Sequence, residues 1–490
     1  MSKLGSAILA LGLATSATHL ATAQQGGAGA SALTIYNQNF AVARTTVDLD
    51  LKAGTNQITT TNVTTLLEPD SVVLRDPAGK IAFKVDEQNY DAGVIDQNSL
   101  LQKYEGKTIQ FSQGRTQDGK PITVEGKIIR ATQPPLIETN DTMQFQLPGT
   151  PLFPASTDGL LLKPTLRWEI FSAKAAHVAA ELAYITRGMS WQATYNIVAP
   201  ETKDVSAAEH VDVMGWVTIL NNSGTEFPQA TIKLMAGDVA KIQDLTVRNR
   251  MLMYDMAAAP MAAGGPGTPI TQQAFDDFHL YDLNRTVSLR SGETKQVQFL
   301  ESSDVTMSRI YEYDGSPDHN VINYAGGHND QPSFGTGSNT KVNVRAEIKN
   351  AVANHLGMPL PAGRIRLYRR DSGGQMEFIG EGTIPHTPTD ETVKVPVGSA
   401  FDVTGSRKQT DFHVDQRAHT IDETYEITVK NQKTSPITVA VVEHLNRGQN
   451  WDLTAKSGDY TRRDSNTIEF PVTVSPSGEV KVTYTVRYTW

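Results

Sequence analysis

Apolar and polar residues alternate along most of this 490-residue chain. The pattern is clearest in residues 181–239, where three alternating segments are joined by polar turns. Other alternating stretches, including 32–43, 45–51 and 160–170, are separated by turns rich in glycine, asparagine, aspartate and proline. Period-two alternation broken by such residues predicts β-strands and hairpins. We therefore predict an all-β protein built from antiparallel sheets.

The best candidate for a helix is a short segment at 96–104, with Asp96 or Ser99 as its N-cap. Strand-like stretches with turns at 118–119 and 133–135 follow this segment. Together with the strands that precede the helix, they predict a small N-terminal β module, or more than one, within residues 32–150.

A pattern of strand, asparagine, polar turn, proline and second strand recurs at Asn221, Asn350 and Asn431. An asparagine side chain can hydrogen-bond the nearby backbone and so end a strand, and proline lacks the donor that a central strand needs. The repetition predicts serial immunoglobulin-like β-sandwiches.

These sandwiches divide the later chain into three parts. We expect a sandwich domain at 155–305, a loop-rich linker at 306–341 and a C-terminal sandwich region at 342–490. Two segments break the strand pattern, 251–273 and 313–341, and their glycine-rich composition predicts long loops.

The first 23 residues have the features of a secretory signal peptide. Lys3 supplies a positive charge, residues 4–20 form an apolar region, and Ala21-Thr22-Ala23 is a cleavage site of small residues. We expect an exported chain, periplasmic or secreted, whose mature form begins near Gln24. No later stretch approaches the roughly 18 apolar residues of a membrane-spanning helix, so we predict no transmembrane helix.

Composition narrows the chemistry and the partners. The chain contains no cysteine, which excludes a disulfide framework and a thiol nucleophile. Its net charge is −9 and no block of like charge stands out, which argues against a nucleic-acid partner.

Several short motifs together resemble a bacterial domain family of unknown function, number 4139, which is related to proteins called mucoidy inhibitors. The motifs are PTLRW at 164–168, YIT at 184–186, SWQATY at 190–195, AGD at 236–238, FHLY at 278–281, LPAGRIRLY at 360–368, FIGE at 378–381, FDV at 401–403 and the end of the chain from 484. The resemblance implies an exported, β-rich envelope protein and supplies no catalytic residue. Mucoidy-inhibitor relatives carry a long coiled coil before this domain, and this chain has no sustained heptad pattern there.

Four residues of the most regular stretch are candidates for interaction. Trp191, Tyr195 and Trp216 could form a face on which sugar rings stack, although aromatic residues in strands more often pack in a core. Asp238 could be a ligand group, or it could close the preceding strand through an Asx turn.

Two carboxylate–histidine groups invite comparison with metal sites. Glu381 and His386, with Glu391 nearby, lie on a segment broken by proline and fit no standard metal spacing. The second group lies in the loop-rich segment, where solvated side chains are the usual interpretation: Asp318, His319, His328 and Asp330. We assign no metal, no other cofactor and no catalytic residue.

Two further motifs resemble parts of catalytic or phosphate-binding sites, but we interpret both as turns. Asp371-Ser372-Gly373 is part of a serine-protease nucleophile motif, but without a histidine–aspartate partner segment it indicates a hairpin turn. Gly106-Lys107-Thr108 matches the end of a phosphate-binding loop whose first glycine is missing, and we interpret it as a turn from helix to strand.

The chain ends in a strict alternation that places one apolar face on its last strand: Val482, Tyr484, Val486, Tyr488 and Trp490. Such an ending is typical of outer-membrane barrels, and it equally suits the last strand of a soluble sandwich with its apolar face inward.

The signal, the strand pattern and the long loops favour an exported bacterial envelope protein that binds or supports rather than catalyses. An envelope polysaccharide or another envelope protein would be its partner. The alternatives are a hydrolase of envelope polymer, which needs convergent carboxylates or a metal in a cleft, and an outer-membrane-associated β protein.

Overall fold

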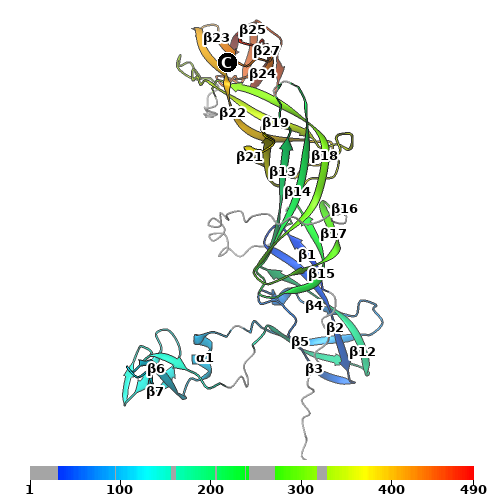
Figure 1. Cartoon of the computed structure of the whole chain (residues 1–490), viewed down its shortest axis with the longest axis vertical. Helices are drawn as coiled ribbons and strands as arrows, with labels where there is room; N and C mark the ends of the chain where they lie inside the picture. Colours follow the sequence, from blue (N-terminus) through cyan, green and yellow to red (C-terminus); the bar gives the residue numbers. More distant parts are fainter. Residues whose placement is uncertain are drawn as a thin grey trace, which may run out of the picture.

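The computed structural model describes residues 31–93, 95–155, 162–202, 204, 207–237, 239–241, 271–316 and 328–490. These residues form β-strands almost throughout, and the molecule is elongated, with one small module standing to the side (Figure 1). The predicted all-β class is confirmed. No helix in the described part of the chain is long and apolar enough to cross a membrane.

The small module contains the predicted helix, α1 (Gln97–Lys103). The Asp96 carboxylate accepts from the Ser99 backbone N–H, and the Ser99 hydroxyl accepts from the Asp96 N–H, which forms a capping box. Five strands follow in the order β10-β6-β7-β8-β9. Their bounds are β6 (Thr108–Arg115), β7 (Pro121–Arg130), β8 (Leu136–Thr139), β9 (Thr142–Gln144) and β10 (Thr150–Leu152).

This module has a core of its own, centred on Phe111, Ile128 and Ile137. It is inserted between β5 (Phe83–Asp91) and β11 (Thr165–Ser172). A Cβ atom on Gly93 would lie 2.3 Å from the backbone carbon of Lys163, so the two ends of the insertion touch.

The remaining N-terminal strands belong to two sheets that also contain later segments. The three-stranded sheet has the order β3-β11-β5, and the seven-stranded sheet has the order β16-β17-β15-β1-β2-β12-β4. Their other bounds are β1 (Ala32–Tyr36), β2 (Phe40–Leu51), β3 (Gly54–Thr60), β4 (Val73–Arg75), β12 (Ala176–Arg187), β15 (Phe227–Ala236), β16 (Thr271–Phe275) and β17 (Phe278–Leu289). The expected division at about 150–155 therefore does not follow the sheets, because β1 pairs in parallel with β15 far along the chain.

The largest sheet has thirteen strands and continues to the C-terminus. Its members are β13 (Met189–Ala199), β14 (Glu209–Asn221), β18 (Glu293–Asp314), β19 (Lys341–Lys349), β20 (Gly363–Arg370), β21 (Met376–Ile384), β22 (Thr392–Asp415), β23 (Thr420–Asn431), β24 (Ile437–His444), β25 (Asn450–Lys456), β26 (Thr461–Arg462), β27 (Thr467–Val474) and β28 (Gly478–Thr489).

Two long strands pass from one sandwich into the next. β18 has 22 residues and pairs first with β14 and then, from Met307, with β19, and its last residues also pair in parallel with β24. β22 has 24 residues and pairs first with β19 and then, from Val403, with β23. We call the units the first (β13–β15, β17, β18), middle (β18–β22) and last (β22–β28) sandwich. The linker expected from residue 306 thus begins inside a strand, because β18 only changes its pairing partner there.

The three asparagines of the recurring pattern are fully buried, and each closes a corner in the same way. The Asn431 amide nitrogen donates to the backbone oxygens of Ser435, Val474 and Ser475 at 2.9–3.2 Å. Asn221 and Asn350 likewise bridge their own turn and a neighbouring strand end. The predicted structural echo is confirmed.

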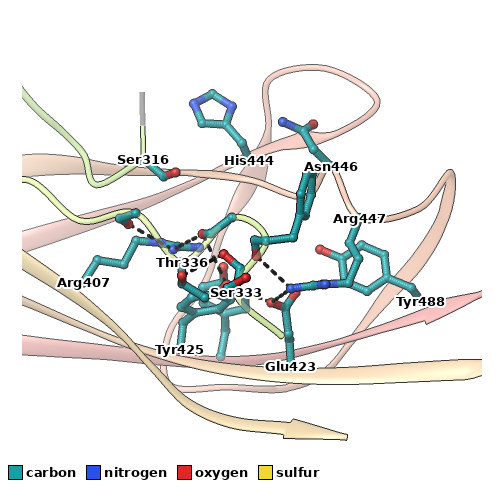
Figure 2. A pocket seen from close by; sticks show the side chains of 14 residues that line it. Ser316, Ser333, Thr336, Arg407, Glu423, Tyr425, His444, Asn446, Arg447 and Tyr488 are labelled. Atoms are coloured by element: carbon teal, nitrogen blue, oxygen red, sulfur yellow. Dashed lines mark hydrogen bonds and ion pairs between the residues drawn. The ribbon is translucent and has the colours of Figure 1, made fainter. Parts of the chain in front are cut away.

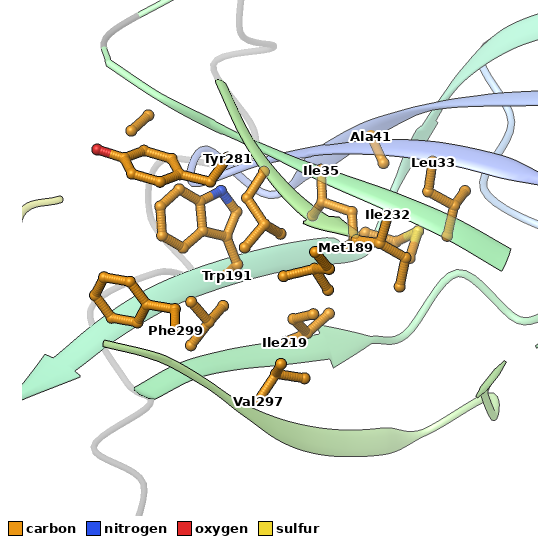
Figure 3. Packing of buried hydrophobic residues seen from close by; sticks show 14 of the residues in the cluster. Leu33, Ile35, Ala41, Met189, Trp191, Ile219, Ile232, Tyr281, Val297 and Phe299 are labelled. Carbon is orange, nitrogen blue, oxygen red and sulfur yellow. The ribbon is translucent and has the colours of Figure 1, made fainter. Parts of the chain in front are cut away.

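The cores of the first and middle sandwiches are continuous with the N-terminal sheets. Figure 3 shows Trp191 and Met189 from β13 between Ile232 of β15 and the strands that carry Ile219 and Val297. The last sandwich has a separate core, to which β28 contributes Val482, Tyr484, Val486 and Tyr488, at most 3% exposed. The apolar face of the final strand is therefore used inside its own sandwich.

Candidate functional site

A cavity of about 210 Å³ lies at one end of the last sandwich. Strands β22, β23 and β28, the end of β24 and the segment 333–337 surround it (Figure 2). Its walls are aromatic, charged and hydroxylated, unlike the aliphatic core beside it. We take this cavity as the candidate functional site.

Strand alternation places two glutamates inside the sandwich. On β23, Glu423 occupies the inward register between Ile421 and Tyr425, and on β24 Glu443 follows Val441 in the same way. Both residues are at most 3% exposed. A buried carboxylate is costly unless it is paired and hydrogen-bonded, so its neighbours determine whether the site is stable.

Glu423 is paired with Arg447, whose Nη2 lies 2.7 Å from Glu423 Oε1. The same oxygen accepts hydrogen bonds from the Tyr425 hydroxyl at 2.8 Å and from Gln409 Nε2 at 2.9 Å. The Arg447 guanidinium also lies 4.7 Å from the centre of the Phe412 ring. One carboxylate thus fixes a guanidinium, a phenol and an amide.

Glu443 is paired with Arg407, whose Nε donates to both carboxylate oxygens at 3.0 and 2.9 Å. The Tyr484 hydroxyl donates to Glu443 Oε2 at 2.5 Å. The Arg407 guanidinium lies 3.6 Å from the centre of the Tyr425 ring, which places the two ion pairs side by side.

The two arginines also hold the segment that covers the cavity. Arg447 donates to the backbone oxygens of Asn329, Gln331 and Phe334 at 2.7–2.9 Å. Arg407 donates to the backbone oxygen of Gly335 at 2.7 Å. An irregular segment is therefore positioned by side chains that are themselves fixed by carboxylates.

Two polar groups of residues that line the cavity make no hydrogen bond within the described residues. Arg447 Nε makes no hydrogen bond, although the residue is only 2% exposed. The Tyr488 hydroxyl, also on a residue 2% exposed, likewise takes no hydrogen bond from any described residue. Burial raises the pKa of Tyr484 and Tyr488 well above 10, so both hydroxyls remain neutral.

His444, the last residue of β24, lies on the cavity wall and contacts the end of β18. Its Nε2 is 2.9 Å from Asp314 Oδ2, at the end of β18. The hydrogen bond with Asp314 raises the pKa of His444 above 6.5, against the opposing effect of burial.

The aromatic candidates lie elsewhere, and two of them are core residues. Trp191 is 4% exposed and donates through Nε1 to the Met235 backbone oxygen at 3.2 Å. Tyr195 is 1% exposed and donates to the Pro361 backbone oxygen at 2.7 Å. Trp216 is half-buried on β14. The packing interpretation accounts for Trp191 and Tyr195, and Asp238 lies outside the described residues.

The second pair of candidates is at the surface of the middle sandwich. Glu381 accepts from Arg366 Nε at 2.8 Å across the β20–β21 pair. His386 Nδ1 accepts from the Ala362 backbone N–H at 3.1 Å. Both side chains are exposed, and each supports a local turn or strand pair.

Of the four candidates in the loop-rich segment, the structure describes two. Asp318 and His319 lie outside the described residues. The His328 ring stacks on Trp490 with 3.8 Å between ring centres, and Asp330 accepts from Gln416 at 3.4 Å. Across the described ranges, no group of three or more histidine, aspartate or glutamate residues is arranged to hold a metal ion.

The two remaining motifs are turns, as predicted. The Asp371 carboxylate accepts from the backbone N–H groups of Gly373 and Gln375, and Gly374 has a φ of +80°. Gly106, which also has a φ of +80°, lies between α1 and β6.

Sequence reasoning did not single out any residue of the cavity as a site. The sequence does contain one signal for this site: Glu423 is a charged residue on the same strand face as the apolar residues Ile421, Tyr425 and Ile427. That signal requires knowing which face of the strand is buried, and both faces of β23 carry charged residues.

Comparison with known proteins locates the cavity within one family match. Residues 180–490, more than half of the chain, match the family described as domain of unknown function DUF4139. The match includes the whole cavity and all three sandwiches. No curated protein matches the chain.

Proposed function

Because the chain belongs to the DUF4139 family, whose function is unknown, we propose a role from the cavity and the signal-like N-terminus. In this proposal the protein is exported to the bacterial cell envelope, where it binds an envelope component without catalysing a reaction. The partner is an envelope polysaccharide or another envelope protein, and the cavity of the last sandwich is the binding site.

The observation that carries this proposal is the way in which two buried carboxylates hold residues of the cavity wall. Glu423 and Glu443 each accept hydrogen bonds from an arginine and a tyrosine inside the sandwich. A general acid or base must exchange a proton with its substrate, and a glycosidase needs two carboxyl groups free to act on one bond. Here both carboxylates orient fixed donors, which suits binding better than hydrolysis.

Two further features support an extracytoplasmic role. The N-terminal pattern of Lys3, an apolar run and Ala21-Thr22-Ala23 is that of an export signal. The elongated array of sandwiches places the cavity at one end of the molecule, far from the small N-terminal module (Figure 1). Such an arrangement presents a binding site at a distance from the rest of the chain.

Cell fractionation combined with retention on purified cell-wall and capsule polymers tests the proposal. We expect recovery outside the cytoplasm, cleavage near Gln24 and retention on an envelope polymer or on one envelope protein. The double variant Tyr488→Phe, Asn446→Ala should lose most of the retention, because both residues line the cavity.

The matched control is Tyr195→Phe, which removes a buried hydroxyl from another sandwich. Recovery of an uncleaved chain in the cytoplasm would contradict export. Equal retention of the cavity variant and the wild type would show that the cavity is not the site, and release of reducing ends from the polymer would establish the hydrolase instead.

A further inference from the structure

We propose that the cavity recognises one neutral, polyhydroxylated ring, the size of a single sugar unit. This inference rests on the proposed binding function and specifies its ligand class. It is derived from the charge balance of the walls, the polar groups that lack partners, and the size of the space.

The charge balance argues for a neutral ligand. Arg407 is matched by Glu443 and Arg447 by Glu423, so neither guanidinium is free for an anion. At the wall, Asp314 is matched by His444. A charged ligand would have to leave water without gaining an unmatched counter-charge, which is unfavourable in a buried site.

The polar groups without partners favour hydroxyl groups on the ligand. The Tyr488 hydroxyl can donate and accept, and no described residue hydrogen-bonds to it. The half-buried Asn446 amide offers both functions on the same wall, and no described residue hydrogen-bonds to it. Adjacent ligand hydroxyls that both donate and accept would satisfy both groups.

The shape of the cavity favours a compact ring. Its volume of about 210 Å³ is below the roughly 300–1,000 Å³ of pockets that hold drug-sized molecules. Tyr425 and Tyr484 also line the wall, but Arg407 stacks on the Tyr425 ring and Phe470 stacks on the Tyr484 ring, so the space itself is bounded mainly by polar groups. A compact ring that carries hydroxyl groups matches this size and these polar groups.

Binding of small glycosides to the full mature chain tests the inference. The probes are neutral methyl hexosides, with glucuronate as the anionic and glucosamine as the cationic counterpart, each titrated by ligand-observed NMR and calorimetry. We expect at least one neutral hexoside to bind more tightly than both charged sugars. Purified capsule polysaccharide, tested in parallel, distinguishes a ring within a polymer from a free sugar.

The informative variant is Tyr488→Phe, which deletes one hydroxyl and keeps the ring in the core. Loss of one hydrogen bond should weaken hexoside binding by about three- to tenfold. Tyr195→Phe, which also deletes a buried tyrosine hydroxyl, should bind like the wild type. Comparison of the thermal transitions of the two variants separates a binding effect from a folding effect.

Three results would overturn the inference: no neutral hexoside binds, a charged sugar binds more tightly, or Tyr488→Phe binds the hexoside like the wild type. If retention on an envelope component still depends on the cavity in those cases, the proposed function stands and only the ligand class is wrong. If retention is independent of the cavity, the proposed function itself fails.

Discussion

Single charged residues determine the character of the last sandwich. Arg407 and Arg447 are buried, and each is held by a carboxylate and by backbone oxygens of the covering segment. Replacing such pairs with apolar residues is often neutral for stability, whereas removing one partner is costly. Their presence in a core is better explained by the site that they shape than by the stability that they add.

His444 makes the stability of the last sandwich depend on pH. Its bond to Asp314, together with the nearby Glu443 and Asp464 carboxylates, raises its folded-state pKa above 6.5. The stabilisation is therefore complete below about pH 6.5, the unfolded value, and is lost as the pH rises through the higher folded-state pKa. Urea unfolding from about pH 5 to about pH 9 should show this decline in the wild type and a smaller one in His444→Gln.

Comparing wild type with His444→Gln separates the contribution of His444 to the pH dependence of stability from that of a second histidine. The pKa of His177 is also raised, by its hydrogen bond to Asp50, and this pair is present in both proteins. Parallel pH profiles of wild type and His444→Gln would show that the Asp314–His444 contact does not contribute.

At the level of strands, the close approach of β22 to β18 depends on a glycine, Gly405, which has no side chain at the point of contact. A Cβ atom on Gly405 would lie 2.2 Å from two ring atoms of Tyr313. Tyr313 is fully buried, and its hydroxyl donates to the Asn339 backbone oxygen at 2.8 Å, so the ring has little freedom to move. The glycine therefore allows the two long strands to pack face to face.

Gly405→Ala should destabilise the last sandwich by about 1–3 kcal/mol, the usual cost of overpacking a core. The measurement is the free energy of unfolding in urea. Gly458→Ala is the matched control, because a Cβ atom there meets nothing within 4 Å. Equal stability of the two variants would mean that β18 and β22 can separate without cost.

Local sequence patterns predicted the elements better than their connections. The capping box of Asp96 and Ser99 and the three buried asparagines depend on neighbouring residues, which a sequence displays directly. The change of partner within β18 at Met307 depends on β19, which alternation within β18 cannot reveal. The cavity was missed for a related reason, because strands far apart in the chain bring Arg407, Glu443 and Tyr484 together.

At the scale of the whole molecule, the small module and the array of sandwiches are built differently. The small module has its own sheet and core, and the ends of its insertion meet at Gly93 and Lys163. The sandwiches share strands and, in the first two, a core. The module can therefore be removed without cutting a sheet.

Replacing residues 95–161 with a short glycine–serine turn should leave the thermal transition of the remaining chain within a few degrees of the full-length protein. Circular dichroism and calorimetry measure the transition. The loss of cooperative unfolding after this deletion would show that the module supports the array.

The shared strands have a consequence for how the protein would carry tension. Sandwiches joined by flexible linkers give way one after another under load, because each ladder of hydrogen bonds is independent. Here a pull along the array acts on β18 and β22, which each belong to more than one sandwich. Extension must break the hydrogen bonds between strands of neighbouring sandwiches at the same time. The array therefore resists stretching as one rod and does not unfold one sandwich after another.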